Sequence, residues 1–249
     1  MKKISEKEEK NMTEVLNYDK ASDADVIEQM FKAGVHFGHQ KSKWNPKMEP
    51  YIFAVKNGIH IIDLVKTKEK LDSALDFMEK ILKSGSQVLF VGTKRQAKDF
   101  TESLSKDLKM PYVTNRWIGG TFTNFKNISK RIAKLDELEG IVQSADSKFK
   151  KQEILVFKKE AGRIEDKLGG LRNMKKIPGA MFIFDVVENK SALKEAKMMG
   201  VPVIALVDTN ANPNEIDWPI PCNDDAIAVI KLIAEIIKAR LIKLNTEEK

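Results

Sequence analysis

The sequence predicts an α/β fold in which a parallel sheet is flanked by helices and carries an inserted antiparallel coiled-coil helical hairpin. Short, continuously apolar runs alternate with segments of helical periodicity, a pattern typical of parallel strands buried on both faces. One long stretch, residues 124–168, breaks this alternation because it contains no strand-like run and no proline. The 249 residues are enough for one large domain or two small ones.

The N-terminal quarter of the chain contains little regular pattern. Residues 1–24 are polar and of mixed charge, so we expect a flexible extension. Apolar side chains at helical spacing predict a short helix over residues 24–32. An irregular loop with glycines, prolines and aromatic residues follows. Beyond it, YIFAV and IHIIDL predict two strands around Asn57 and Gly58, a dipeptide typical of β-hairpin turns.

From residue 65 onward, helical and strand-like segments alternate. Apolar side chains in residues 65–84 recur three and four positions apart, as on the buried face of a helix. SQVLFVGT is a short, uninterrupted apolar run that ends near a glycine, as in a buried parallel strand. By these two patterns we expect helices over residues 65–84, 94–108, 189–199 and 224–242, and strands over residues 86–93, 111–115, 180–185 and 201–208.

Residues 124–168 carry two narrow apolar stripes with steps of three and four residues. Such stripes pack two helices along a coiled-coil seam, and SADS (144–147) is a suitable turn between them. Glycine pairs at 119–120 and 169–170 are expected to give the backbone freedom needed where this arm leaves and rejoins the sheet domain. The predicted parts are a flexible extension (1–24), a discontinuous α/β domain (25–120 and 169–243), the coiled-coil hairpin (121–168) and a short tail (244–249).

The composition favours an anionic partner. Lysine and arginine total 43 against 36 aspartate and glutamate residues, a formal charge of +7, and nucleic acid is the commonest partner of such a chain. Only six of these cations are arginine, and lysine binds phosphate as a point charge instead of reading bases. No run approaches 18 apolar residues and there is a single cysteine, so we expect no membrane partner and a reducing, cytoplasmic location.

Patterns for catalysis or cofactor binding are weak. VLFVGTKRQA resembles the start of a phosphate-binding βα unit but has neither GxGxxG nor GxxxxGK[ST]. Asp185 and Asp208 follow predicted strands at the sheet edge where α/β proteins bind ligands, although aspartate at this place usually caps the next turn. His36 and His39 are too few to hold a metal unless Asp208 or Asp185 completes the site. We therefore expect no enzyme, no cofactor and no metal, with His39 and Asp208 as the candidate ligands if a metal is bound.

Two loops interleave cations with aromatic rings. They are HQKSKWNPKMEPYIF, around Trp44, and TNRWIGGTFTNFKN, around Trp117. Cations mixed with aromatic residues suit RNA phosphates and unstacked bases. Alternatively, the rings anchor the loops in the core, and both interpretations hold if the rings point inward and the cations outward.

Long motifs along the chain resemble the bacterial small-subunit ribosomal protein two, or S-two, family. They are AGVHFGHQKSKWNPKMEPYIFAVKNGIHIIDLVKT, VLFVGTKRQA, NRWIGGTFTNF, LGGLRNMKKIPGAMFIFD and GVPVIALVDTNANPNEIDWPIPCNDDAI, and the resemblance covers about residues 25 to 242. The resemblance implies a Rossmann-like domain with a protruding coiled coil. It also implies a structural, non-enzymatic role in the ribosome: binding small-subunit rRNA, contacting neighbouring proteins and helping to recruit the S-one protein, with no small-molecule substrate.

We assign rRNA contact to side chains, mostly cationic, of the two loops, of the TKR segment at residues 93–95, of the arm, and of the segment that follows the arm. They are Lys41, Lys43, Trp44, Lys47, Lys94, Arg95, Arg116, Lys126, Lys130, Arg131, Lys134, Arg163, Lys175 and Lys176. Joint replacement of Lys94 and Arg95 with alanine is expected to weaken incorporation into subunits without unfolding the protein. The alternatives are a nucleotide-binding module or enzyme on the same fold, and an arm that docks a protein instead of RNA.

Overall fold

A computed structural model describes residue 18 and residues 22–144 and 149–243. The helices are α2 (Asp23–Ala33), α3 (Leu64–Lys83), α4 (Lys98–Leu108), α5 (Phe125–Ser144), α6 (Lys151–Leu168), α7 (Lys190–Met198) and α8 (Ile227–Leu241). The strands are β1 (Phe37–Gln40), β2 (Ile52–Lys56), β3 (Ile59–Ile62), β4 (Val88–Val91), β5 (Tyr112–Val113), β6 (Ala180–Ile183), β7 (Val203–Val207) and β8 (Trp218–Pro221). Most of the predicted extension, and the tail from residue 244, lie outside the described residues.

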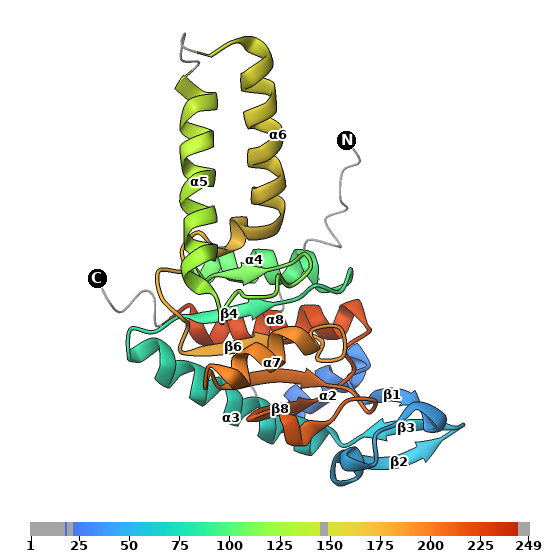
Figure 1. The fold of residues 1–249 in the computed structure, drawn as a ribbon. Coiled ribbons are helices and arrows are strands. Elements are labelled where there is room, and N and C mark those ends of the chain that lie inside the picture. Colours follow the sequence, from blue (N-terminus) through green and yellow to red (C-terminus); the bar gives the residue numbers. More distant parts are fainter. Residues whose placement is uncertain (1–17, 19–21, 145–148, 244–249) are drawn as a thin grey trace, which may run out of the picture.

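The central sheet contains five parallel strands in the order β5-β4-β6-β7-β8 (Figure 1). Counted along the chain this order is 2-1-3-4-5, which is one of the two common orders of doubly wound α/β sheets. The strand order reverses between β4 and β6, so the carboxyl ends of these two strands form the topological switch point. The predicted parallel, Rossmann-like sheet is confirmed.

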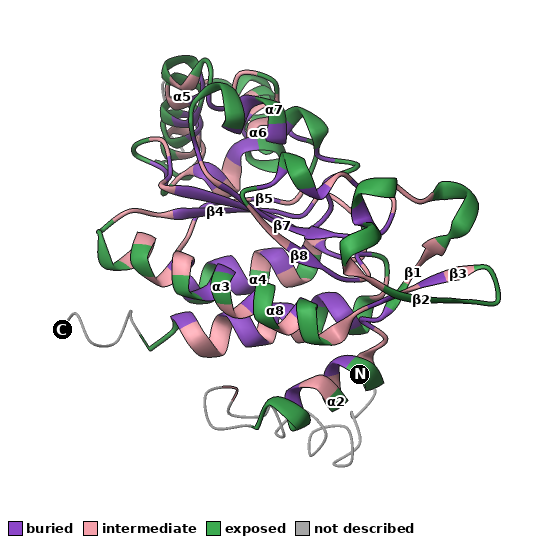
Figure 2. Ribbon diagram, turned by 90° about the horizontal axis from the view of Figure 1, so that it is seen from below, coloured by how far each residue is buried: buried purple, intermediate pink, exposed green. Residues whose placement is uncertain are grey.

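Both faces of this sheet are covered, which explains the continuously apolar strands. Val88 and Phe90 of β4 pack with α3, α4 and α8, while Leu89 and Val91 pack toward α7 and the first turns of α5. β6 and β7 alternate in the same way, and the strands are buried along their lengths (Figure 2). Successive side chains of a strand point to opposite faces, so a strand buried on both sides needs an apolar residue at every position.

Two strands were not predicted from the sequence. β8 has the sequence WPIP, and proline lacks the N–H that a central strand donates, yet β8 lies at the sheet edge and pairs only with β7. β1 lies in the segment expected to be an irregular loop, where it pairs with β3 in a small antiparallel sheet of order β1-β3-β2. The predicted hairpin between β2 and β3 is confirmed, with Asn57 (φ 52°) and Gly58 (φ 76°) both left-handed, as in a type I′ turn.

Two predicted helices begin later in the chain than expected. α4 begins at Lys98 instead of residue 94, and α8 begins at Ile227 instead of residue 224. Asn223 still caps the turn before α8, because its side-chain oxygen accepts the N–H groups of Asp225 (2.9 Å) and Ala226 (3.2 Å). Residues 94–97 and 223–226 are therefore turns that lead away from the carboxyl edge of the sheet.

Between β5 and β6 the chain forms α5 and α6, which lie side by side, run in opposite directions and project from the sheet (Figure 1). Leu135, Leu138 and Ala161 are buried between them, and Ile128 and Ile132 continue this apolar stripe into the core beside the sheet. The predicted helical segments are thus present, while residues 145–147 of the predicted turn lie outside the described residues.

The four glycines at the ends of this helix pair do not all act as expected. Gly120 is left-handed (φ 90°), which fits the predicted need for backbone freedom. Gly170 is needed for space instead, because a Cβ there would lie 2.3 Å from the backbone oxygen of Tyr112 in β5. The absence of a side chain at Gly170 lets the chain leaving α6 pass directly beside the edge strand.

Replacing Gly170 with alanine is expected to lower the free energy of unfolding by about 1–3 kcal/mol, because the backbone must move to relieve the clash. Gly162 offers a matched control, since it lies inside α6 and a Cβ there would meet nothing within 4 Å. Gly162→Ala is expected to stabilise the protein by about 0.5–1 kcal/mol through helix propensity. Urea unfolding of both variants measures the difference, and a neutral Gly170→Ala would show that the close approach is not rigid.

Candidate nucleic-acid interface

The carboxyl edge of the sheet holds a cluster of ion pairs around Lys94. The Lys94 ammonium lies 3.2 Å from Asp185 Oδ2 after β6, and 3.0 Å and 2.5 Å from carboxylate oxygens of Asp224 and Asp225 after β8. Asp185 and Asp224 are almost fully buried. Burial alone lowers the pKa of Lys94, but the carboxylates outweigh it and raise the pKa above its ordinary value. Burial and the neighbouring Asp185 and Asp208 raise the pKa of Asp224 to about 7, against the opposing effect of Lys94.

This geometry gives Lys94 a structural role. Its ammonium lies among the carboxyl groups of Asp185, Asp224 and Asp225 at the switch point, so its replacement is expected to destabilise the fold, and its contact with rRNA stays a prediction. Asp185 also caps its turn, as its Oδ1 accepts the N–H groups of Val187 (2.7 Å) and Glu188 (3.1 Å). The sequence-based interpretation of Asp185 as a capping residue is therefore confirmed.

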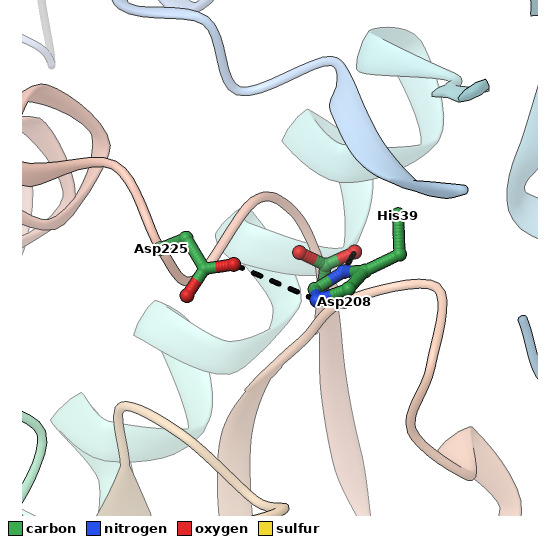
Figure 3. Close-up of side chains that lie close together, drawn as sticks. All are labelled: His39, Asp208 and Asp225. Atoms are coloured by element: carbon green, nitrogen blue, oxygen red, sulfur yellow. Dashed lines mark ion pairs between the residues drawn. The ribbon is translucent and has the colours of Figure 1, made fainter. Parts of the chain in front are cut away.

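His39 of β1 lies beside this cluster, between two carboxylates (Figure 3). Its Nδ1 is 3.0 Å from Asp208 Oδ1, and its Nε2 is 3.5 Å from Asp225 Oδ2. The hydrogen bond to Asp208 is the largest cause that raises the pKa of His39, and burial opposes it. One ligand atom from each of the three residues lies within 4.8 Å of the others, so His39 and Asp208 stay candidate metal ligands and Asp225 joins them. Asp185 faces Lys94 instead.

Glu195 of α7 holds the second cation-rich loop in place. Its buried carboxylate accepts hydrogen bonds from Trp117 Nε1 (3.2 Å), Gly120 N (2.7 Å), Phe122 N (3.0 Å) and Thr123 N (3.3 Å). Burial raises the pKa of Glu195, but these donors outweigh it and leave the pKa below the ordinary value. No cation pairs with Glu195 among the described residues, so its charge is compensated by backbone and indole N–H groups and by the Thr123 hydroxyl, which donates at 3.4 Å.

In this loop the rings point inward and the cation points outward. Trp117 and Phe122 are buried and pack edge to face with ring centroids 5.3 Å apart, whereas Arg116 is exposed. The loop around Trp44 follows the same rule in part. Trp44 is half-buried and stacks on His60 at 4.6 Å. The rings therefore anchor the loops as the second interpretation expects, and RNA contact by the outward cations stays a prediction.

Arg172 joins the two projecting helices. Its guanidinium binds both carboxylate oxygens of Glu139 in α5, at 2.8 Å and 2.6 Å, and lies 2.5 Å from Glu165 in α6. Bidentate arginine–carboxylate pairs fix orientation as well as distance. Arg172 therefore sets how α5 and α6 lie against each other and against the segment that follows them. Lys134 adds a further pair to Glu160 across the helices, at 3.2 Å, so its charge is partly neutralised.

Ten of the predicted rRNA-binding residues fall into two regions of the fold (Figure 1). One region is the small sheet, and the other is the projecting helix pair with the loop at its root. Apart from Lys94 and Trp44, all of the predicted side chains are exposed. The first region holds Lys41, Lys43, Trp44 and Lys47, and the second holds Arg116, Lys126, Lys130, Arg131, Lys134 and Arg163. Arg95 lies on the turn before α4, and Lys175 and Lys176 lie on the segment before β6.

Two predicted residues converge at what we call the root cleft, a cavity of about 760 Å³ between residues 115–119, α5 and the end of α6. Arg116, Arg131 and Lys167 line it together with Asp166, and an adjoining cavity of about 440 Å³ adds Lys130. Across the described ranges, 22–144 and 149–243, none of these four cations forms an ion pair. The root cleft thus has more cations than carboxylates in its concave lining, a net positive charge.

Sequence reasoning missed three contributors to this region. Lys167 was not among the candidate residues, although the sequence places it beside the glycine pair at the end of the arm. Glu195 and Arg172 carried no signal at all, since a charged residue in an amphipathic helix or loop usually faces solvent. Only the folded chain shows that Glu195 points into the loop and that Arg172 has three carboxylates near it.

Within the described part of the chain, none of the helices combines the length and hydrophobicity needed to cross a lipid bilayer. The sequence profile of ribosomal protein S2 matches residues 30–243. A relative from Fusobacterium nucleatum subsp. nucleatum, the "Small ribosomal subunit protein uS2", is 44% identical over 221 residues, which cover 88% of this chain and 90% of the relative. With its doubly wound sheet, its projecting helices and a profile match over most of its length, the chain belongs to the ribosomal protein S2 family.

Proposed function

We propose that this protein is a structural constituent of the small ribosomal subunit, in the cytoplasm, where it binds small-subunit rRNA without acting as an enzyme. The observation that carries this proposal is a group of cations at the root of the projecting helices, Arg116, Lys130, Arg131 and Lys167, which have no ion pair within the described part of the chain. Such cations bind phosphates and release counterions, which is the main source of affinity for RNA backbones. Family membership and the small-subunit name of the relative support the assignment.

The two basic regions suggest how the protein engages RNA. The loop around Trp44 joins β1 and β2 of the small sheet, whereas α5 and α6, whose roots line the root cleft, project from the opposite side of the central sheet (Figure 1). We propose that α5 and α6 form an inserted antiparallel coiled coil that reaches a second rRNA segment. A chain that binds two rRNA segments holds them in a fixed relative position during subunit assembly. Lys41, Lys43, Lys47, Arg95, Lys126, Arg163, Lys175 and Lys176 are exposed and stay in this proposal as phosphate contacts.

The helix pair also suits contact with protein. Leu155 and Val156 of α6 are each 59% exposed, and neighbouring exposed apolar side chains favour a protein partner over RNA. Contacts with neighbouring small-subunit proteins, and help in recruiting the S-one protein, form part of the proposal. We propose no small-molecule substrate at the carboxyl edge of the sheet. There the ammonium of Lys94 is paired with three carboxyl groups, so it is not available to a ligand phosphate.

The direct test measures binding of the full chain to small-subunit rRNA as a function of salt. For a triple variant, Arg116→Ala, Lys130→Ala and Arg131→Ala, the slope of log K against log salt is expected to become shallower by about 2–3, because each phosphate that is no longer neutralised reduces it by roughly 0.7–0.9. The unfolding free energy should not change, because none of the three forms an ion pair within residues 22–144 and 149–243.

The matched control removes three exposed lysines from α7, Lys190→Ala, Lys194→Ala and Lys197→Ala, and is expected to keep the wild-type slope. Equal reductions of the slope in the two triple variants would mean that net charge alone, and not the root cleft, determines the affinity. Cosedimentation of a tagged chain with small subunits in lysate tests the wider assignment. A chain that stays free of subunits and of RNA at low salt would overturn it.

A further inference from the structure

The root cleft is concave. A protein does not need a concave surface to contact the phosphate backbone of an RNA duplex. The phosphates of an A-form helix lie on its outside, so cations on a flat or convex surface reach them. The cavity of about 760 Å³ falls instead within the range of about 300–1,000 Å³ typical of sites that enclose a small organic ligand. Its lining combines cations with the apolar side chain of Ile118 and the polar Asn115 and Asp166.

The wall of this pocket is fixed before any ligand binds. Glu195 holds four N–H groups of residues 117–123, and Trp117 and Phe122 bury their rings beneath the loop. At its other end, the Asn115 amide donates to the backbone oxygen of Asp166 in α6, and Lys98 Nζ donates to Asn115 Oδ1 at 2.9 Å. A preorganised wall avoids the entropy cost of ordering a loop on binding.

The chemistry of the lining matches one nucleotide. Arg116, Arg131 and Lys167 provide charge for a phosphate, and the neighbouring Lys130 extends this charge along α5. Arginine guanidinium groups also stack on bases, Ile118 offers an apolar surface, and Asn115 and Asp166 offer hydrogen-bonding groups for a base edge. Proteins read single-stranded loops and bulges by enclosing unstacked bases in this way.

We propose that the root cleft takes up a single unpaired nucleotide, bulged out of an rRNA helix, while the cations around it bind the flanking phosphates. This inference rests on the proposed function, since it names the part of the RNA that the basic root region recognises. It goes beyond backbone binding because it predicts a preference for an RNA with an unpaired nucleotide over the same RNA fully paired.

Gly119 allows a test that leaves all charges in place. It lines both cavities, and a Cβ at this position would meet nothing within 4 Å, so the backbone has room for a side chain and Gly119→Leu is expected to add bulk at the cleft. A second variant, Arg116→Ala with Arg131→Ala, removes charge from the cleft. Its control, Lys158→Ala with Lys159→Ala, removes the same charge from exposed positions of α6 that line neither cavity.

The experiment uses the full chain and two RNA hairpins, one with a single bulged 2-aminopurine and one with that position paired. The wild type is expected to bind the bulged hairpin about 10-fold more tightly, the size of one stacking contact, with a change in 2-aminopurine fluorescence. Gly119→Leu and the arginine variant should lose this preference and the fluorescence change, and the lysine control should keep both. Melting curves establish that each variant is folded.

Each other outcome counts against the inference in its own way. Equal, salt-sensitive binding of both hairpins by the wild type would overturn the nucleotide site and leave the proposed function standing. Absence of salt-dependent binding to either hairpin and to small-subunit rRNA would overturn both. Binding of free AMP as tightly as the bulged hairpin, abolished by Gly119→Leu, would identify the occupant as a free nucleotide and overturn the RNA assignment.

Discussion

Replacing Lys94 with methionine is expected to lower the free energy of unfolding by about 3–5 kcal/mol, the usual cost of removing one partner from a buried ion pair. Methionine keeps the apolar stem of the side chain and removes the ammonium, which lies within 3.2 Å of oxygens of Asp185, Asp224 and Asp225. Asp185 and Asp224 are almost fully buried and would be left close together without a cation. Denaturant unfolding followed by circular dichroism measures the decrease.

Arg95, the next residue, is the matched control for Lys94. It is exposed and has no ion pair in the part of the chain that the structure describes, so Arg95→Met is expected to change stability by no more than about 0.5 kcal/mol. Adding Asp224→Asn to Lys94→Met is expected to change stability little near neutral pH, because the loss of Lys94 removes a cause that lowers the pKa of Asp224 and leaves this buried carboxyl protonated. If Lys94→Met and Arg95→Met unfold at the same denaturant concentration, the cluster does not stabilise the fold and a phosphate contact for Lys94 regains support.

Replacing Glu195 with alanine is expected to cost about 3–5 kcal/mol of unfolding free energy. Two of its donors, Trp117 Nε1 and Phe122 N, are buried, and each loses a hydrogen bond to a charged acceptor that is worth about 1.5–3 kcal/mol. Gly120 and Thr123 lose their acceptor as well. The loop of residues 117–123 then loses the hydrogen bonds that hold its backbone in place, so the variant should also lose the preference for an unpaired nucleotide.

Glu195→Gln separates charge from shape. Glutamine keeps the size of the side chain, but its amide group must face N–H donors, so we expect a loss of about 1–3 kcal/mol near neutral pH. The pKa of Glu195 is lowered in the folded state from its ordinary 4.5, so its stabilising effect is complete above pH 4.5 and decreases as the pH falls through the lower, folded-state pKa. The stability difference between wild type and Glu195→Gln should shrink over that acidic range. A constant difference, or an equal loss in the exposed control Glu188→Gln, would contradict this account.

Much of the fold could be predicted because the buried positions of a helix or strand hold apolar residues in a regular pattern. β4, β6 and β7 are apolar throughout because both faces of the sheet are covered, and the stripe from Ile128 to Leu138 recurs because one face of α5 is buried. The sequences of β8 and β1 do not show such a pattern. β8 contains two prolines that only an edge position tolerates, and β1 is a short strand in a glycine- and histidine-rich segment.

The candidate site was predicted less completely. Exposed cations in aromatic loops were recognised, and Arg116, Lys130 and Arg131 line two adjoining cavities. Lys94 looked the same in the sequence, yet it lies among carboxylates that come from positions about 90 and 130 residues further along the chain. Glu195 is the converse case, since it has the appearance of a solvent-facing residue and is one of the most heavily hydrogen-bonded side chains near the cleft.

The sequence by itself therefore determined the parallel sheet with its covering helices, the two projecting helices, the basic character and, through its long motifs, the family. These properties depend on composition and on patterns within single segments. The tertiary structure decided which cations are free to meet a phosphate, what holds the loop of residues 115–123, and where a cleft opens. Those properties depend on which distant side chains come within hydrogen-bonding distance, and an electrostatic partner at 3 Å leaves no periodic signal in the chain.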